Sequence, residues 1–118
     1  MSRLRKNASK PGDSKIRIIA GDWRSRKLPV LSEDGLRPTG DRMRETLFNW
    51  LGPRVQGARC LDVFAGTGCL GLESLSRGAK HVDFLELNPR VAKQLRDNLA
   101  LLSCTNAAVK NTDAIREL

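Results

Sequence analysis

The stretch Leu61-Asp-Val-Phe-Ala-Gly-Thr-Gly-Cys-Leu-Gly71 predicts a buried strand, a glycine turn and the start of a helix. Gly66 and Gly68 lack a Cβ, so the backbone there can take positive φ and approach a ligand closely. Gly71 falls on the first turn of the expected helix, where a side chain would hold helix and strand apart. The stretch therefore indicates an α/β fold with a ligand against the turn. The alternative is a tight strand-to-helix turn without a ligand.

A second apolar run, His81-Val-Asp-Phe-Leu-Glu-Leu87, carries Glu86 twenty residues after Gly66. In a parallel sheet Glu86 would stand at the carboxyl end of the neighbouring strand. A carboxylate at that place can accept hydrogen bonds from both hydroxyls of a ribose. The glycine turn, the helix start and the downstream acid together predict half of a binding site for a cofactor built on adenosine.

Asp62 distinguishes among the adenosine cofactors, because it lies within the strand, four positions before Gly66. The pyrophosphate of a dinucleotide needs backbone amides and a helix N-terminus, and an added carboxylate would repel it. The same carboxylate could attract, directly or through water, the amino group of a methionine moiety. Asp62 therefore favours S-adenosylmethionine over NAD. An NAD-dependent oxidoreductase stays open as an alternative, and so does a purely structural Asp62 bonded to backbone amides.

Strands are expected over 59–64, 81–87 and 107–110, and helices over 69–77 and 89–102. This alternation predicts a parallel sheet with right-handed crossovers. Asn88 and Pro89 suit the cap and the first position of the second helix. That helix carries an apolar stripe expected to pack on the sheet: Val91, Leu95, Leu99 and Leu102.

The first part of the chain predicts a flexible basic tail (residues 1–14) and then a small basic hairpin. Its strands are expected over 16–20 and 23–28, joined at Gly21-Asp22 and ended by Pro29. A loop over 32–38 leads to a helix that begins at Thr39 or Asp41, either of which could cap it. Gly52-Pro53 should stop this helix, and its apolar side is expected in the core: Met43, Leu47, Phe48, Trp50 and Leu51.

The net charge of +8 is unevenly distributed. Residues 1–54 hold thirteen Lys/Arg and six Asp/Glu, whereas residues 55–118 hold eight and seven. This asymmetry predicts that the first part binds an anionic partner, and nucleic acid is the commonest such partner. For residues 1–14 the alternative is a tail that only improves solubility.

No apolar run fits a membrane span or a secretory signal. Cys60, Cys69 and Cys104 lack metal-ligand spacing, so reduced thiols in a cytoplasmic protein without a metal are expected.

Three runs carry a family resemblance: Arg17–Pro29 (RIIAGDWRSRKLP), Gly35–Leu51 (GLRPTGDRMRETLFNWL) and Leu61–Leu75 (LDVFAGTGCLGLESL). They resemble the ribosomal RNA small subunit methyltransferase D family, bacterial enzymes that methylate the N2 amine of one guanine in 16S rRNA. The resemblance extends from Lys15 to Leu118. It implies a Rossmann-like S-adenosylmethionine-dependent methyltransferase fold, here the first half of the parallel sheet preceded by a basic β-hairpin and a helix. Residues 15–54 would cover the cleft, and residues 55–118 would form the cofactor-binding half.

The resemblance also implies roles for single residues. Asp62, Phe64, Gly66 and Gly68 would hold the methionine end of the cofactor, Glu86 the ribose and Asp113 the adenine amino group. The hairpin and the Arg-Pro-Thr loop would lie over the cleft. That placement puts Trp23 at the cleft and implies a cofactor contact for Thr39 and RNA contacts for Arg24, Arg26, Lys27 and Arg37. The implied partner is 16S rRNA or an assembly intermediate of the small subunit, with guanine 966 as the target and a monomeric protein.

The chain departs from the family at the catalytic signature, an Asp/Asn-Pro-Pro-Phe/Tyr run. No Pro-Pro occurs in the sequence, and Asn88-Pro-Arg90 is no substitute because it begins a helix after the second strand. The catalytic residues are therefore not identified. The chain is expected to be the N-terminal part of such an enzyme and inactive alone; a non-catalytic RNA-binding module derived from one is the alternative.

Overall fold

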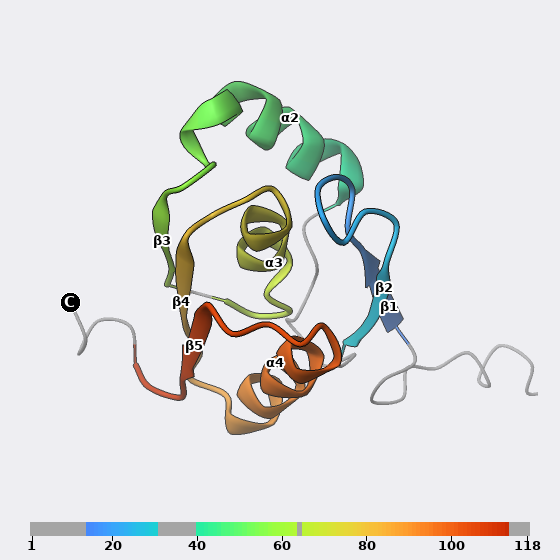
Figure 1. The fold of residues 1–118 in the computed structure, drawn as a ribbon. Helices are drawn as coiled ribbons and strands as arrows, with labels where there is room; N and C mark the ends of the chain where they lie inside the picture. Colours follow the sequence, from blue (N-terminus) through green and yellow to red (C-terminus); the bar gives the residue numbers. More distant parts are fainter. Residues whose placement is uncertain (1–13, 31–39, 64, 114–118) are drawn as a thin grey trace, which may run out of the picture.

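The computed structural model describes residues 14–30, 40–63 and 65–113. Its centre is a parallel sheet in which β3 (Arg59–Asp62), β4 (His81–Leu85) and β5 (Ala107–Lys110) lie side by side in chain order. The helices α3 (Cys69–Ser76) and α4 (Pro89–Leu101) both cover the same face of this sheet (Figure 1). The predicted α/β architecture with parallel strands is confirmed.

Each of these elements was predicted to within two residues at its ends, because the signals are local. The Asn88 side chain accepts hydrogen bonds from the amides of Arg90 (2.9 Å) and Val91 (3.3 Å), as expected of an N-cap. The predicted stripe on α4 is buried in the core. Gly71 allows α3 to lie close to the sheet, since an added Cβ would stand 2.2 Å from the Phe84 ring. That close approach confirms the role predicted for this glycine.

The N-terminal hairpin exists, but its strands differ from the prediction. β1 (Ser14–Arg17) pairs antiparallel with β2 (Lys27–Val30), and residues 18–26 form the connection. Pro29 was expected to end the second strand and instead lies within it, opposite Lys15. The Pro29 carbonyl accepts a hydrogen bond from the Asn98 side chain of α4 (2.8 Å). The carbonyl and the nitrogen of Pro29 therefore both point away from β1. The missing N–H therefore costs no bond in the ladder.

The helix α2 (Asp41–Leu51) ends where predicted, at Gly52, and a short 3-10 turn, η1 (Gly52–Arg54), follows it. Its start corrects the prediction, because Gly40 occupies the cap position and Asp41 is already helical. Asp41 instead pairs with Arg17 (2.9 Å) and with Arg44, one turn further along the helix. A carboxylate in the first turn is favourable there because it faces the positive end of the helix dipole.

The apolar side of α2 was predicted correctly for Phe48, which is buried, and for Leu51, which is half-buried against the core, but wrongly for the other three residues. Met43 and Trp50 are 67% and 84% exposed, and Leu47 is exposed as well. The buried stripe that contains Phe48 also contains Arg44, which is 1% exposed. The pattern held two stripes at helical spacing, and the helix buries the one that carries an arginine, because a buried carboxylate on α3 balances its charge.

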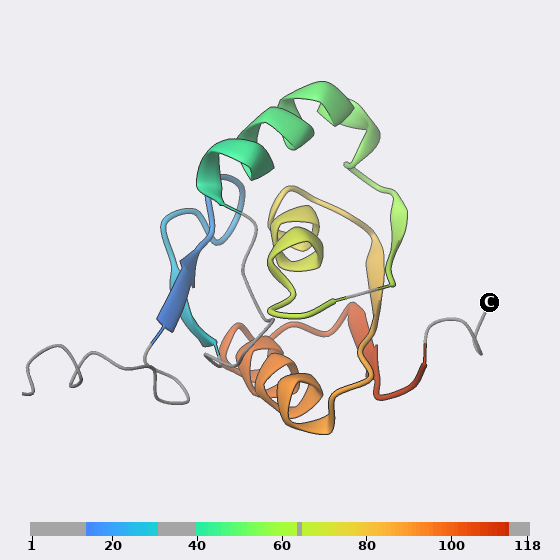
Figure 2. The ribbon, with the colours of Figure 1, turned by 180° about the vertical axis from the view of Figure 1, so that it is seen from behind.

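α3 lies in the middle of the molecule, enclosed by the sheet, α2, the hairpin and α4 (Figures 1 and 2). The hairpin is thus packed against helices and not against the sheet itself. The helices in the described part of the chain are too short, or too polar, to cross a membrane.

Candidate functional site

The glycine turn lies at the carboxyl edge of the sheet, between β3 and α3. Gly66 and Gly68 both have positive φ, 52° and 82°. The turn is closed by a hydrogen bond from the Gly68 amide to the Ala65 carbonyl (2.6 Å) and tied to β4 by one from the Ala65 amide to the Leu85 carbonyl (3.1 Å). Bare backbone therefore faces the edge of the sheet, and the left-handed conformation predicted for these glycines is confirmed.

The Glu86 side chain lies against the glycine turn and also fixes its conformation through a hydrogen bond. One carboxylate oxygen accepts the Gly66 amide (2.7 Å), and the other accepts the Asn88 amide (2.9 Å). A carboxylate has about four lone-pair sites, so each oxygen keeps one that a ligand hydroxyl could use. The side chain is only partly buried, which leaves that approach open. The spacing of twenty residues thus brings the acid and the turn into direct contact.

The two other predicted acids stand at the ends of the flanking strands. Asp62 ends β3 opposite Phe84, and Asp113 follows β5 in a half-buried position. The segment after β5 wraps around Glu86: the Asn111 amide group donates to the backbone carbonyls of Glu86 (2.9 Å) and Leu87 (2.7 Å). Sequence reasoning missed Asn111, whose role depends on the neighbouring strand. Three predicted site residues lie outside the described part of the chain: Arg37, Thr39 and Phe64.

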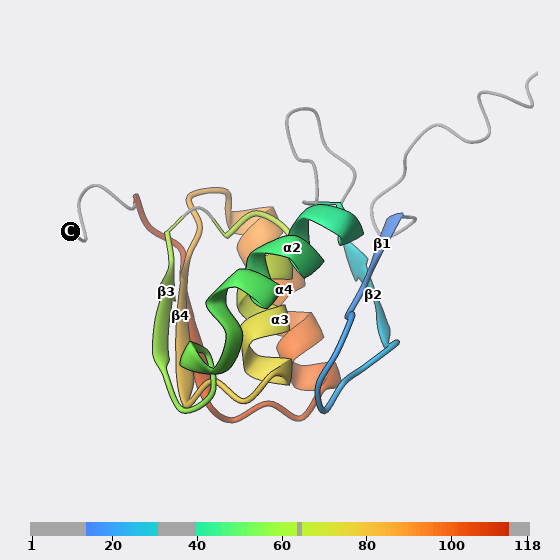
Figure 3. The same cartoon turned by 90° about the horizontal axis from the view of Figure 1, so that it is seen from above.

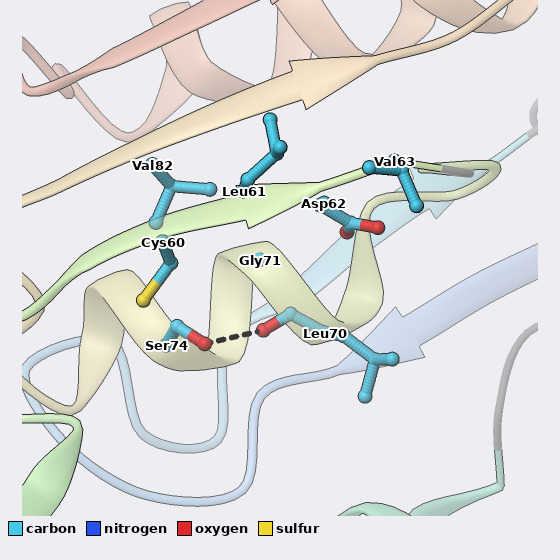
Figure 4. A pocket seen from close by; sticks show the side chains of 8 residues that line it. All are labelled: Cys60, Leu61, Asp62, Val63, Leu70, Gly71, Ser74 and Val82. Carbon is cyan, nitrogen blue, oxygen red and sulfur yellow. Dashed lines mark hydrogen bonds between the residues drawn. The ribbon is translucent and has the colours of Figure 1, made fainter. Parts of the chain in front are cut away.

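A cavity of about 210 Å³ lies between β3 and α3, below Asp62 (Figure 4). Cys60 from β3 and Ser74 from α3 line it, whereas Leu61 points away from α3. Burial raises the pKa of the Cys60 thiol, and a hydrogen bond with Ser74 opposes this only in part. Burial thus favours the neutral form of this thiol over the thiolate.

The basic residues of the hairpin lie elsewhere. Arg24 and Arg26 belong to the exposed connection between β1 and β2, and Lys27 begins β2. This connection is bonded to Ser76, the last residue of α3, whereas the glycine turn precedes the first. Figure 3 shows the two at opposite ends of α3. The basic residues therefore lie at the opposite end of α3 from the glycine turn. The expected place of Trp23, Arg24, Arg26 and Lys27 over the cofactor and substrate cleft stays a prediction, and so does contact of the basic residues with RNA.

A buried ionic cluster, also missed from the sequence, joins the hairpin to α3. The Glu73 carboxylate is fully buried and pairs with Arg44 (3.3 Å) and Arg77 (2.8 Å). Arg77 also lies over the Phe48 ring, 4.8 Å from its centre, and so ties α2 to α3. A signal existed, because Glu73 is the one charged residue in the apolar helix segment CLGLESLS.

No group of three or more His, Cys, Asp or Glu side chains within residues 14–30, 40–63 and 65–113 is placed to hold a metal ion. The three cysteines carry free thiols, and Cys69 is buried. The carboxyl edge instead brings together the bare backbone of the glycine turn, the Glu86 carboxylate bonded to it, and the carboxylates of Asp62 and Asp113 after the two flanking strands.

The sequence profile of the family described as Conserved hypothetical protein 95 matches residues 16–118. Ribosomal RNA small subunit methyltransferase D from Haemophilus influenzae is 63% identical over 91 residues, covering 77% of this chain and 47% of that protein. The protein of the same name from Escherichia coli K12 is 54% identical over 110 residues, covering 93% and 56%. The chain thus spans about half the length of the curated relatives it matches.

Solved structures agree with this grouping. The Escherichia coli protein yhhF superposes with a TM-score of 0.82 at 51% identity, over 88% of this chain and 56% of that one. A dimethyladenosine transferase from Plasmodium falciparum shares only the fold, with a TM-score of 0.58 at 18% identity over 68% of this chain and 28% of that one. The Rossmann-like fold of S-adenosylmethionine-dependent methyltransferases, predicted from the sequence, is confirmed for the described half of the sheet.

Proposed function

The chain belongs to the family described as Conserved hypothetical protein 95, and from that premise we propose that it is the cofactor-binding half of a ribosomal RNA methyltransferase that uses S-adenosylmethionine. The observation that carries the proposal is the bond between the Glu86 carboxylate and the Gly66 amide (2.7 Å). This bond sets a ribose acceptor beside bare backbone at the carboxyl edge of the sheet, which is where open α/β folds bind nucleosides.

The donor set suits a sulfonium nucleoside. Glu86 would bind the ribose hydroxyls through its remaining lone pairs, and Asp113 would accept the adenine amino group. Asp62 would attract the ammonium group of the methionine end, while Gly66 and Gly68 let the backbone come close. We place Phe64 and Thr39 at the same cofactor. When bound, S-adenosylmethionine supplies an electrophilic methyl group, and the task of these residues is to hold and orient it.

For the substrate we propose the N2 amine of a guanine in 16S rRNA, guanine 966 by resemblance, in free RNA or in an assembling small subunit. The basic side chains Arg24, Arg26, Lys27 and Arg37 would contact its phosphates. The protein is proposed to work as a monomer in the cytoplasm.

This chain lacks the Pro-Pro-aromatic signature, so we expect that it transfers no methyl group alone. The second candidate function is a non-catalytic RNA-binding module.

A pair of assays on the 118-residue chain separates these readings. Filter binding of a 16S rRNA transcript at several salt concentrations measures RNA affinity, and titration calorimetry with S-adenosylhomocysteine measures cofactor affinity. The proposal predicts binding of both. A chain that binds RNA but not S-adenosylhomocysteine would be the non-catalytic module, and one that binds NAD in preference would be an oxidoreductase fragment.

Replacing Glu86 with glutamine is expected to weaken S-adenosylhomocysteine binding by roughly ten- to a hundredfold. The change removes the charge and turns one acceptor oxygen into a donor that faces a backbone N–H. Hydrogen bonds to a charged group contribute roughly 1.5–3 kcal/mol each. Calorimetry measures the effect. The control is Asp83→Asn on β4, the strand that Glu86 follows, since Asp83 pairs with His81 (3.0 Å) away from the turn. Equal losses in both variants would contradict a ribose role for Glu86.

Reversing the charge of Arg24, Arg26 and Lys27 to glutamate is expected to weaken RNA binding about tenfold or more. It should also lower the slope of log affinity against log salt by about 3, because each cation that meets a phosphate contributes about one to it. Cofactor affinity should stay unchanged, since these residues lie at the far end of α3. The control reverses three other exposed cations, Arg54, Arg59 and Lys80. A control that weakens RNA binding as much would show that only total charge matters.

A further inference from the structure

The connection between β1 and β2 is held by two residues one turn apart on α3. The Glu73 carboxylate accepts the amides of Ile19 (2.9 Å) and Ala20 (3.0 Å). The Ser76 hydroxyl donates to the Ala20 carbonyl (2.6 Å) and accepts the Trp23 amide (2.9 Å). The Ser76 carbonyl accepts the Asp22 amide (2.8 Å). Glu73 and Ser76, here called the α3 clamp, thus bind residues 19–23, which lead from β1 into the basic turn 23–26.

The backbone of Gly21 lies directly against the backbone of Ser76, so the connection packs tightly against the α3 clamp. Gly21 has a φ of +89°, and an added Cβ would stand 1.9 Å from the Ser76 carbonyl oxygen. Backbone meets backbone there, so no side-chain movement could make room. Only glycine at this position allows the connection to reach Ser76.

The ionic partners of Glu73 also stabilise the contact between the α3 clamp and the hairpin. Glu73 is fully buried, with Arg44 and Arg77 as its ionic partners, so its carboxylate cannot exchange the hairpin amides for water without exposing the cluster. Arg44 further donates to the Arg17 carbonyl at the end of β1 (2.8 Å). The hairpin is therefore fixed to α3 at its turn and to α2 at its strand.

We propose that Glu73 and Ser76 are positioning residues for RNA: they hold the basic turn 23–26 at a set distance from the cofactor. α3 has eight residues, Cys69–Ser76, and at 1.5 Å per residue spans roughly 12 Å. The glycine turn precedes one end of this helix, and the clamp holds the basic turn at the other. The helix would thus act as a rigid spacer between bound phosphates and methyl donor. This inference rests on the proposed function.

Ser76→Ala and Gly21→Ala test the positioning role in the 118-residue chain. Ser76→Ala removes two bonds to the connection, so the Trp23 amide should exchange its hydrogen about tenfold faster or more. Because RNA must then order a loose turn, affinity for a 16S rRNA transcript should fall about tenfold, while affinity for S-adenosylhomocysteine stays within about twofold.

The matched controls are Ser74→Ala and Gly57→Ala. Ser74 lies on the same helix and donates to the Leu70 carbonyl within it (2.9 Å). Gly57 also has a positive φ, +77°, but nothing lies within 4 Å of an added Cβ. Both controls should leave RNA affinity unchanged. Measured thermal stability of every variant separates local loosening of the turn from loss of the fold.

Faster exchange over residues 19–23 together with weaker RNA binding and unchanged cofactor binding would support the inference. Faster exchange with unchanged RNA affinity would overturn it, and so would a parallel loss of both affinities, which marks a merely structural role. An unaltered chain that binds no RNA transcript at all would refute the RNA part of the proposed function and the positioning role with it. In that case the amide exchange rates over residues 19–23 would still show whether Glu73 and Ser76 hold the basic turn.

Discussion

Replacing Gly68 with valine is expected to abolish binding of S-adenosylmethionine. Gly68 has a φ of +82°, and an added Cβ would lie 2.5 Å from a Leu95 methyl carbon. A β-branched residue is strained in that conformation, and the overpacked contact costs a further 1–3 kcal/mol or so. The turn must move, and the close backbone approach to the cofactor is lost. Titration with S-adenosylhomocysteine should show an affinity at least about a hundredfold weaker, equivalent to about 2.8 kcal/mol.

Gly57→Val is the matched control, because Gly57 has a similar positive φ but open space around it. It carries the conformational strain without changing the cofactor edge, so cofactor affinity should be retained. Gly68→Ala is the milder variant: the atom it meets is the end of a flexible leucine side chain, which can shift. It should fold and bind more weakly than the unaltered chain. Full affinity in Gly68→Val would show that backbone approach is not what the turn provides.

Replacing Glu73 with alanine is expected to lower the free energy of unfolding by about 3–5 kcal/mol. The change leaves the Arg44 side chain, which is 2% exposed, without its carboxylate on α3 and leaves the amides of Ile19 and Ala20 without an acceptor. For a domain of this size the midpoint of thermal unfolding should fall on the order of 10–25 °C. Circular dichroism during heating measures it.

The control for Glu73 is the exposed pair of Lys93 and Asp97, whose side chains are 74% and 53% exposed. Asp97→Ala removes an equivalent charge and a 2.9 Å contact in water, so the loss should stay below about 1 kcal/mol. Similar losses in the two variants would mean that burial of the Glu73 cluster contributes little. The expected difference is large because desolvated charges depend on their partners, whereas exposed ones are solvated and screened.

The sheet half of the molecule could be predicted from the sequence because its signals are short-range. The cap at Asn88, the stripe on α4 and the spacing between Gly66 and Glu86 each depend on neighbouring residues or on one strand-to-strand step. Gly71 was placed correctly for the same reason. What spacing alone could not show is the bond from the Gly66 amide to Glu86, which makes the acid part of the turn.

The N-terminal half was harder to predict because its contacts are long-range. Which stripe of α2 is buried depends on Arg44 finding Glu73, 29 residues later in the chain. The extent of the hairpin depends on Ser76, 53 residues after Trp23, and so does the position of the basic turn. Composition correctly located the excess charge but carried no information on which end of α3 it occupies.

The most direct test of the account is an NMR titration of the amide signals of the 118-residue chain with S-adenosylhomocysteine. We expect the largest shifts at Gly66, Gly68 and Asn88, because the first two form the turn and the last is held by Glu86. The basic turn 23–26 should shift little, and NAD should move none of these signals. If S-adenosylhomocysteine leaves Gly66 and Gly68 unshifted at saturating concentration, or shifts only signals elsewhere, the carboxyl edge of this sheet is not a cofactor site.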